Sequence, residues 1–170
     1  MLLARGKPLI AWTIEAANSA KCISRVILSS DDHEIIETAK QYGCEVPFVR
    51  PTSLSTDSAK SIDVVLHALQ ELPGYDYIIL LQPTSPLRRS SDIDSAFELI
   101  MQNDAPSCVS LTTAEQSPYW MFKLDDAGKL EPLFGWDTVS SRRQDLPPDC
   151  ALNGAIYIAK TEWLINNKGF

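Results

Sequence analysis

The chain has 170 residues, of which 45% are hydrophobic and 22% charged, and its formal net charge at pH 7 is -7. This length corresponds to about one domain with a sizeable core. The acidic balance argues against nucleic acids and anionic membranes as general partners, because both favour an excess of Lys and Arg. No apolar run approaches the ~18 residues of a membrane span, and the first residues do not form a signal peptide. We therefore expect a cytoplasmic protein.

Helices and strands are predicted to alternate through the first half of the chain. The helices are recognised by apolar residues at helical spacing and by capping or stop residues at their ends. The strands are short runs of β-branched and leucine residues. In chain order these segments are a helix from Pro8, a strand at 25–29, a helix from Asp31 or Asp32 to Gly43, a strand at 45–49, and a helix that Pro73 and Gly74 end.

The most informative segment is the apolar run 77–81, which passes directly into the polar, proline-containing loop 82–88. A helix capped by Ser91 and a strand at 108–111 follow. The unbroken alternation predicts an α/β fold with a mainly parallel sheet and helices on both faces. In such sheets small ligands bind at the carboxyl ends of the strands, so this loop is the first candidate for a ligand site.

The pattern changes after Thr113, where two β segments, 118–124 and 130–136, flank a turn at 125–128. We interpret them as an inserted arm, at about 114–147, of a single domain that spans residues 1–170. The arm carries more aromatic surface than a lone hairpin can bury, so we expect it to pack against a second subunit. A core strand at 155–159 and a short helix from Thr161 complete the chain.

Seven segments, taken together and in order, resemble the acylneuraminate cytidylyltransferases, which make CMP-activated sialic, legionaminic and pseudaminic acids. The matching segments are residues 6–12, 29–32, 50–51, 58–63, 80–88, 142–147 and 153–157. The resemblance implies a three-layer α/β/α fold of the nucleotide-diphospho-sugar transferase type and a homodimer built by the inserted arm. It also implies Mg²⁺-dependent transfer of CMP from CTP to an acidic nine-carbon sugar, with release of pyrophosphate.

The resemblance also implies roles for three residues in the first half of the chain. Arg50 and Ser61 match positions that hold the nucleotide, and Gln82 matches the position that contacts the sugar. Their chemistry suits these tasks, because a guanidinium is a planar fork of donors, a hydroxyl at a helix start meets the helix dipole, and an amide both donates and accepts. Taken alone, Arg50 is typical of a solvated loop and Ser61 of a helix cap.

Three further roles fall in the second half of the chain. Either Arg142 or Arg143 matches the family arginine that we assign to the sugar carboxylate or to the developing charge. Asn153, expected just before a strand, would contact the hydroxyl or acyl groups of the sugar, although Asn153-Gly154 alone is typical of a turn. We interpret Arg88 and Arg89 as surface charges or partners of nearby aspartates.

Two parts of the family pattern are not matched in these 170 residues. They are the basic glycine-containing loop that holds the CTP phosphates and the late aspartates that bind the metal. We therefore expect no Mg²⁺ ligands in this chain, and little or no activity from the chain as it stands. Two alternatives are a CMP-transferase for the eight-carbon sugar acid of lipopolysaccharide and a non-enzymatic fragment that binds sugar or dimerises. The first is disfavoured because the loop at 82–86 has no acidic residue.

Overall fold

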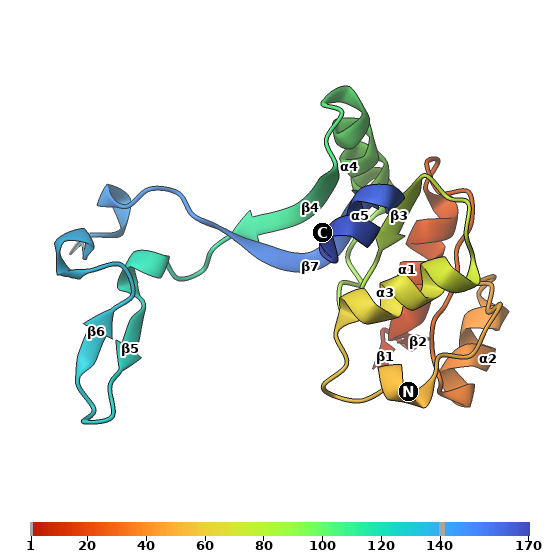
Figure 1. Cartoon of the computed structure of the whole chain (residues 1–170), viewed down its shortest axis with the longest axis horizontal. Helices are drawn as coiled ribbons and strands as arrows, with labels where there is room; N and C mark the ends of the chain where they lie inside the picture. Colours follow the sequence, from red (N-terminus) through yellow and green to blue (C-terminus); the bar gives the residue numbers. More distant parts are fainter. Residues whose placement is uncertain (1, 140–141) are drawn as a thin grey trace. The chain divides into compact units, whose positions relative to one another are not determined.

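The computed structural model describes residues 2–139 and 142–170, and the side chain of Arg143 is outside the described part (Figure 1). The chain divides into two compact units, one made of Met1–Ser110 with Gly154–Phe170 and the other of Leu111–Asn153. The first unit contains all five α-helices of the described residues. These are α1 (Leu9–Ser19), α2 (His33–Gln41), α3 (Ser61–Glu71), α4 (Ser90–Gln102) and α5 (Thr161–Asn167).

A three-stranded sheet, with the order β3-β7-β4, forms the centre of the first unit. Its strands are β3 (Tyr77–Leu80), β4 (Ser107–Thr113) and β7 (Cys150–Lys160), and both β4 and β7 continue into the second unit. β3 pairs with β7 in antiparallel register, with Tyr77 opposite Lys160 and Leu80 opposite Tyr157. A two-residue hairpin of β1 (Leu3–Ala4) and β2 (Lys7–Pro8) precedes α1.

The two strands predicted at 25–29 and 45–49 meet in one parallel bridge, between Ile27 and Glu45. The Leu28 amide donates to the Glu45 carbonyl at 2.8 Å, and the Glu45 amide donates to the Val26 carbonyl at 3.0 Å. Pro47 follows and has no amide hydrogen to donate, which accounts for the short pairing. Parallel and antiparallel pairing therefore both occur in this unit.

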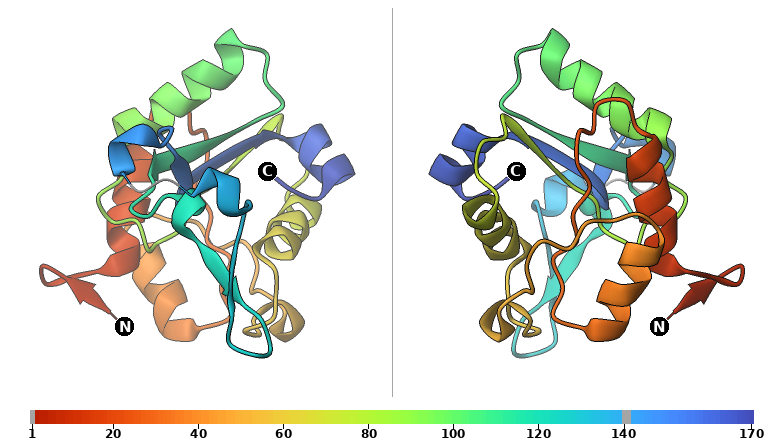
Figure 2. Two further views of the ribbon diagram at one scale, coloured as in Figure 1. Left: turned by 90° about the vertical axis from the view of Figure 1, so that its left-hand side faces the viewer. Right: turned by 90° about the vertical axis from the view of Figure 1, so that its right-hand side faces the viewer.

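Helices cover both faces of the sheet, as the alternation predicts (Figure 2). α1 and α4 lie on one face, and α3 and α5 lie on the other. The side chains of β3 alternate between these layers because successive residues of a strand point to opposite faces. Tyr77 and Ile79 pack in the cluster that contains Ile93 of α4, whereas Ile78 and Leu80 pack in the cluster of α3 and α5. β3 is therefore apolar on both faces, which is typical of a strand in a sheet that helices cover on both sides.

A third apolar cluster joins α1, α2 and the Ile27–Glu45 bridge. α2 begins after Asp32, whose carboxylate accepts a hydrogen bond from the Ile35 amide at 3.0 Å, so Asp32 rather than Asp31 is the cap.

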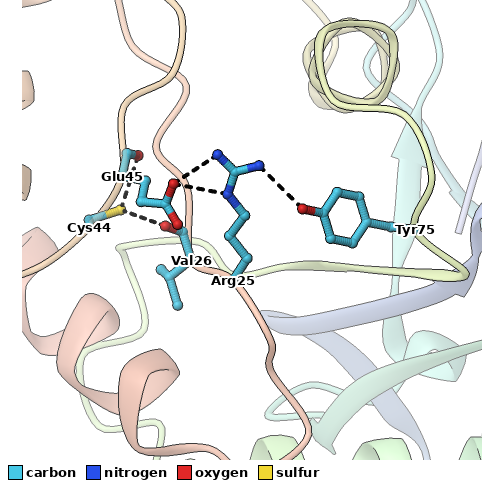
Figure 3. Close-up of polar contacts among 5 residues, drawn as sticks. All are labelled: Arg25, Val26, Cys44, Glu45 and Tyr75. Atoms are coloured by element: carbon cyan, nitrogen blue, oxygen red, sulfur yellow. Dashed lines mark hydrogen bonds and ion pairs between the residues drawn. The ribbon is translucent and has the colours of Figure 1, made fainter.

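Close to the bridge, Arg25 donates to one carboxylate oxygen of Glu45 at 2.9 and 2.8 Å and to the Tyr75 hydroxyl at 3.2 Å (Figure 3). This pairing lowers the pKa of Glu45. The contact ties residues 25, 45 and 75 together.

The second unit contains the predicted hairpin, in which β5 (Phe122–Leu124) pairs antiparallel with β6 (Leu130–Pro132). Two aromatic pairs lie in this unit, Tyr119 with Phe134 and Phe122 with Trp136, at ring-centroid distances of 5.4 and 5.9 Å. Phe134 and Trp136 nevertheless remain 55% and 67% exposed.

Along the described chain, no helix is both long and apolar enough to cross a membrane.

Candidate functional site

Gln82 lies just beyond the carboxyl end of β3 and is half-buried. Its carbonyl oxygen accepts hydrogen bonds from Nη2 of Arg88 at 2.7 Å and from the Ser85 amide at 3.4 Å. The loop that follows β3 is therefore closed on itself, and the backbone of Gln82 is held at the edge of the sheet where the ligand site is predicted.

Arg88, which we predicted to be a surface charge or a partner of a nearby aspartate, is only 8% exposed. Besides the carbonyl of Gln82, its guanidinium donates to the carbonyl of Ala155 at 2.9 Å and to the hydroxyl of Thr13 at 3.3 Å. Burial lowers the pKa of this guanidinium, and the negative charge of Asp92 opposes that shift. The prediction for Arg88 was wrong because backbone carbonyls of distant segments supply its acceptors. Its neighbour Arg89 is exposed, as predicted.

Gly154 lies directly against the side chain of Gln82. A Cβ atom at this position would be 2.7 Å from Oε1 of Gln82, which is shorter than any ordinary contact, and the φ angle of Gly154 is +72°. The positive φ angle would strain any residue with a Cβ atom, so the backbone favours glycine here, and an added Cβ atom would displace the amide of Gln82. Asn153 and Gly154 are inside β7, so the expectation that Asn153 precedes the strand, and the plainer reading of a turn, were both wrong.

Arg50 is half-buried and is not a solvated loop residue. Its Nη2 donates to the Ser29 carbonyl at 2.9 Å, and its backbone amide donates to the Ser30 carbonyl at 3.0 Å. Nε of Arg50 and Oγ of Ser29 are buried, and neither has a hydrogen-bond partner within the described residues. Buried polar atoms of this kind usually have partners, so the pair is suited to binding a polar or anionic ligand.

Ser61 is the first residue of α3 and is exposed. Lys60 occupies the cap position of this helix, so the plainer reading of Ser61 as the cap was wrong. A hydroxyl in the first turn lies beside backbone amides that have no partner within the helix, which favours an anion or a ribose hydroxyl. Across the described residues, no hydrogen bond joins Arg50, Ser61 and Gln82 to one another.

The remaining predicted residues belong to the second unit. Arg142 donates to both carboxylate oxygens of Asp145, at 2.8 and 3.1 Å, and its side chain is 66% exposed. Arg143 begins a short 3-10 helix, Arg143–Asp145, but its side chain lies outside the described residues. The amide of Asn153 donates to the Leu111 carbonyl at 3.2 Å. These contacts give the local surroundings of Arg142 and Asn153.

Comparison with known proteins shows the family. A sequence profile described as cytidylyltransferase matches residues 1–134 of the chain. The chain belongs to the cytidylyltransferase family. The predicted enzyme class, a nucleotidyltransferase of this type, is thereby confirmed.

Two bacterial cytidylyltransferases resemble the chain over nearly its whole length. CMP-N,N'-diacetyllegionaminic acid synthase of Legionella pneumophila is 36% identical over 173 residues, which cover 99% of this chain and 73% of that protein. Pseudaminic acid cytidylyltransferase of Campylobacter jejuni is 36% identical over 164 residues, which cover 94% of this chain and 70% of that protein. The resemblance inferred from the seven sequence segments is confirmed.

The fold of this cytidylyltransferase is also found among solved structures. CMP:2-keto-3-deoxy-manno-octonic acid synthetase complexed with CTP superposes with a TM-score of 0.67 at 17% identity, over 98% of this chain and 68% of the other. At this identity the similarity concerns the fold alone, and it confirms the predicted α/β class.

The described side chains of this cytidylyltransferase do not form a ready-made metal site. No group of three or more His, Cys, Asp or Glu residues in that part of the chain is placed to hold an ion. The predicted site residues whose side chains are described are instead neutral or positively charged, namely Gln82, Arg50 and Ser61 in the first unit and Arg142 and Asn153 in the second. Such residues bind, orient and neutralise anionic groups.

Proposed function

We propose that this cytidylyltransferase transfers CMP from CTP to a nonulosonic acid of the legionaminic, pseudaminic or sialic type and releases pyrophosphate. The single observation that carries the proposal is the placement of Gln82. Its amide lies just beyond the carboxyl end of β3, against a glycine that leaves room for it. Open α/β sheets bind small ligands at this edge. The names of the two relatives with 36% identity support the class of sugar.

The proposed reaction is attack of the anomeric hydroxyl of the sugar on the α-phosphorus of CTP. The bond between the sugar oxygen and the α-phosphorus forms as the bond between the α-phosphorus and the bridging oxygen of pyrophosphate breaks. Pyrophosphate leaves, and the hydroxyl proton passes to solvent. Such a displacement needs an aligned nucleophile and neutralisation of the charge on the departing group. Gln82 would align the sugar. Arg50 would donate to the nucleotide from its half-buried guanidinium, and Ser61 would donate from the first turn of α3 to phosphate or ribose.

Two arginines and one asparagine of the predicted set have proposed roles in recognition of the acidic sugar. Arg142 or Arg143 would bind the sugar carboxylate, since a guanidinium matches a carboxylate in two parallel hydrogen bonds. Arg142 already makes such a pair with Asp145. Its role therefore requires exchange of one carboxylate for another. Asn153 would donate to hydroxyl or acyl groups of the sugar.

The proposal includes a homodimer, formed through the inserted arm, in the cytoplasm. The exposed aromatic side chains of the arm, among them Phe134 and Trp136, support a protein partner because monomers rarely leave such surface uncovered. Mg²⁺ is expected to neutralise phosphate charge when bound. The described residues form no cluster of three or more His, Cys, Asp or Glu side chains for this ion.

Calorimetry and a pyrophosphate-release assay test the proposal together. CTP with Mg²⁺ is titrated first, then N-acetylneuraminic, legionaminic and pseudaminic acids, with the eight-carbon acid as the competing substrate. We expect binding of CTP and of at least one nine-carbon acid, and about tenfold weaker sugar binding in the Gln82→Ala variant, equivalent to about 1.4 kcal/mol. Arg89→Met, at an exposed position, is the matched control. Tighter binding of the eight-carbon acid, or no binding of any sugar, would overturn the proposal.

A further inference from the structure

Arg88 is a charged side chain to which the proposed function gives no role. It is buried and donates a hydrogen bond to the carbonyl of Gln82. We propose that Arg88, together with Gly154, is a positioning residue that sets the amide of Gln82 in the sugar site. The inference rests on the proposed role of Gln82. It concerns how that amide is held, and the tests of the two ideas can be separated.

The burial of Arg88 needs an explanation, because removing a guanidinium from water is costly unless its donors are satisfied. The partners of Arg88 are two backbone carbonyls and one hydroxyl, and no carboxylate accepts a hydrogen bond from it in the described residues. These acceptors belong to three separate segments: the loop after β3, β7 and α1. A rigid planar fork that joins three segments fixes their mutual positions.

Two of these hydrogen bonds hold the two backbone segments that meet where the Gln82 side chain contacts Gly154. Nη2 of Arg88 holds the carbonyl of Gln82 at 2.7 Å, and Nε holds the carbonyl of Ala155 at 2.9 Å. Ala155 directly follows Gly154, whose missing Cβ leaves the space that Oε1 of Gln82 occupies. One guanidinium therefore fixes both the backbone that carries the amide and the strand against which the amide rests.

This arrangement predicts that Gln82 loses its orientation when either support is changed. In Arg88→Met, the guanidinium that links the carbonyl of Gln82 to the carbonyl of Ala155 on β7 is absent. In Gly154→Ala, the added methyl group displaces the Gln82 amide, since a contact of 2.7 Å cannot be retained. Neither change touches Arg50 or Ser61, the residues proposed to hold the nucleotide. We therefore expect a selective loss of sugar affinity.

The experiment compares each variant with a matched control. Gly74→Ala imposes an alanine at positive φ where no atom lies within 4 Å of the new methyl group, and Arg89→Met removes an exposed arginine next to Arg88. Affinities for CTP with Mg²⁺ and for the nine-carbon acid are measured by calorimetry. We expect about tenfold weaker sugar binding in Gly154→Ala and Arg88→Met, CTP binding within about twofold, and no such loss in the controls. The side-chain amide resonance of Gln82 should shift in both test variants even without sugar.

Gln82→Ala separates this inference from the proposed function. If Gln82→Ala leaves sugar affinity unchanged, the role of Gln82 itself is wrong. If Gln82→Ala weakens sugar binding but Gly154→Ala and Arg88→Met do not, the positioning role is refuted. When Gln82 is already alanine, Gly154→Ala should cause no further loss of sugar affinity, and an additive loss would also refute the inference. Should Arg88→Met fail to fold, the Gly154 variants decide the outcome.

Discussion

Replacing Arg88 with methionine should lower the free energy of unfolding by about 1–5 kcal/mol. The side chains are similar in length, so the change removes the guanidinium and keeps much of the apolar stem. Two short hydrogen bonds from a charged donor, to the carbonyls of Gln82 and Ala155 at 2.7 and 2.9 Å, are lost, as is the longer one to Thr13 at 3.3 Å.

The magnitude follows from two opposing contributions. Hydrogen bonds from a charged group contribute about 1.5–3 kcal/mol each, and the 3.3 Å bond about 1 kcal/mol, which gives a gross loss of about 4–7 kcal/mol. Methionine avoids the desolvation cost of a buried guanidinium, which returns roughly 2–3 kcal/mol. The difference remains destabilising because both carbonyls lose a short hydrogen bond from a charged donor.

Urea denaturation followed by far-ultraviolet circular dichroism measures this difference. Arg89→Met should change the stability by no more than about 0.5 kcal/mol, since residue 89 is exposed. An unchanged or increased stability of Arg88→Met would show that the hydrogen bonds only offset the cost of burial. In that case the reasoning from the geometry of the fork would be wrong.

Three further predictions concern the core, a helix cap and a thiol. Ile158→Ala, at a fully buried position of β7, should cost about 2–5 kcal/mol in urea denaturation, and a cost below about 1 kcal/mol would contradict the described packing. Asp32→Ala removes the cap of α2 and should cost about 1 kcal/mol, whereas Asp31→Ala should be nearly neutral in the same assay. Burial raises the pKa of Cys44 from 9.0 to about 11, so the folded state keeps a proton that the unfolded state loses. Stability should therefore fall between pH 9 and 11, by at most about 3 kcal/mol, and a Cys44→Ala variant that keeps the same slope in urea denaturation would contradict this assignment.

The sequence pattern was sufficient for the elements whose contacts are local. Apolar spacing predicted the buried face of α4, where Ile93 and Ile100 are almost fully buried, and the inward face of α2 at Ile36 and Ala39. Helical periodicity depends only on residues three and four apart, so one sequence reveals it. The run 77–81 likewise predicted a strand that is apolar on both sides.

The sequence pattern failed where the surroundings of a residue come from distant segments. Arg88 reads as a surface charge because its acceptor on β7 lies 67 residues further along the chain. The requirement for glycine at position 154 depends on Gln82, 72 residues earlier, and no local rule predicts that contact. At Ser61 the failure was one of boundary, since α3 begins one residue earlier than a serine cap would require.

The two apolar faces of β3 leave open how its position along β7 is determined. Where one face is polar, a shift by one residue exposes apolar side chains and is strongly disfavoured. Here such a shift would exchange one apolar set for another, and would move Gln82 by about 3.3 Å along the strand direction. Only in the observed alignment does Gln82 both accept a hydrogen bond from the guanidinium of Arg88 and lie against Gly154, where there is no Cβ atom. The residues that shape the ligand edge therefore also select the register of the central sheet, and a sheet that pairs wrongly would lack the site.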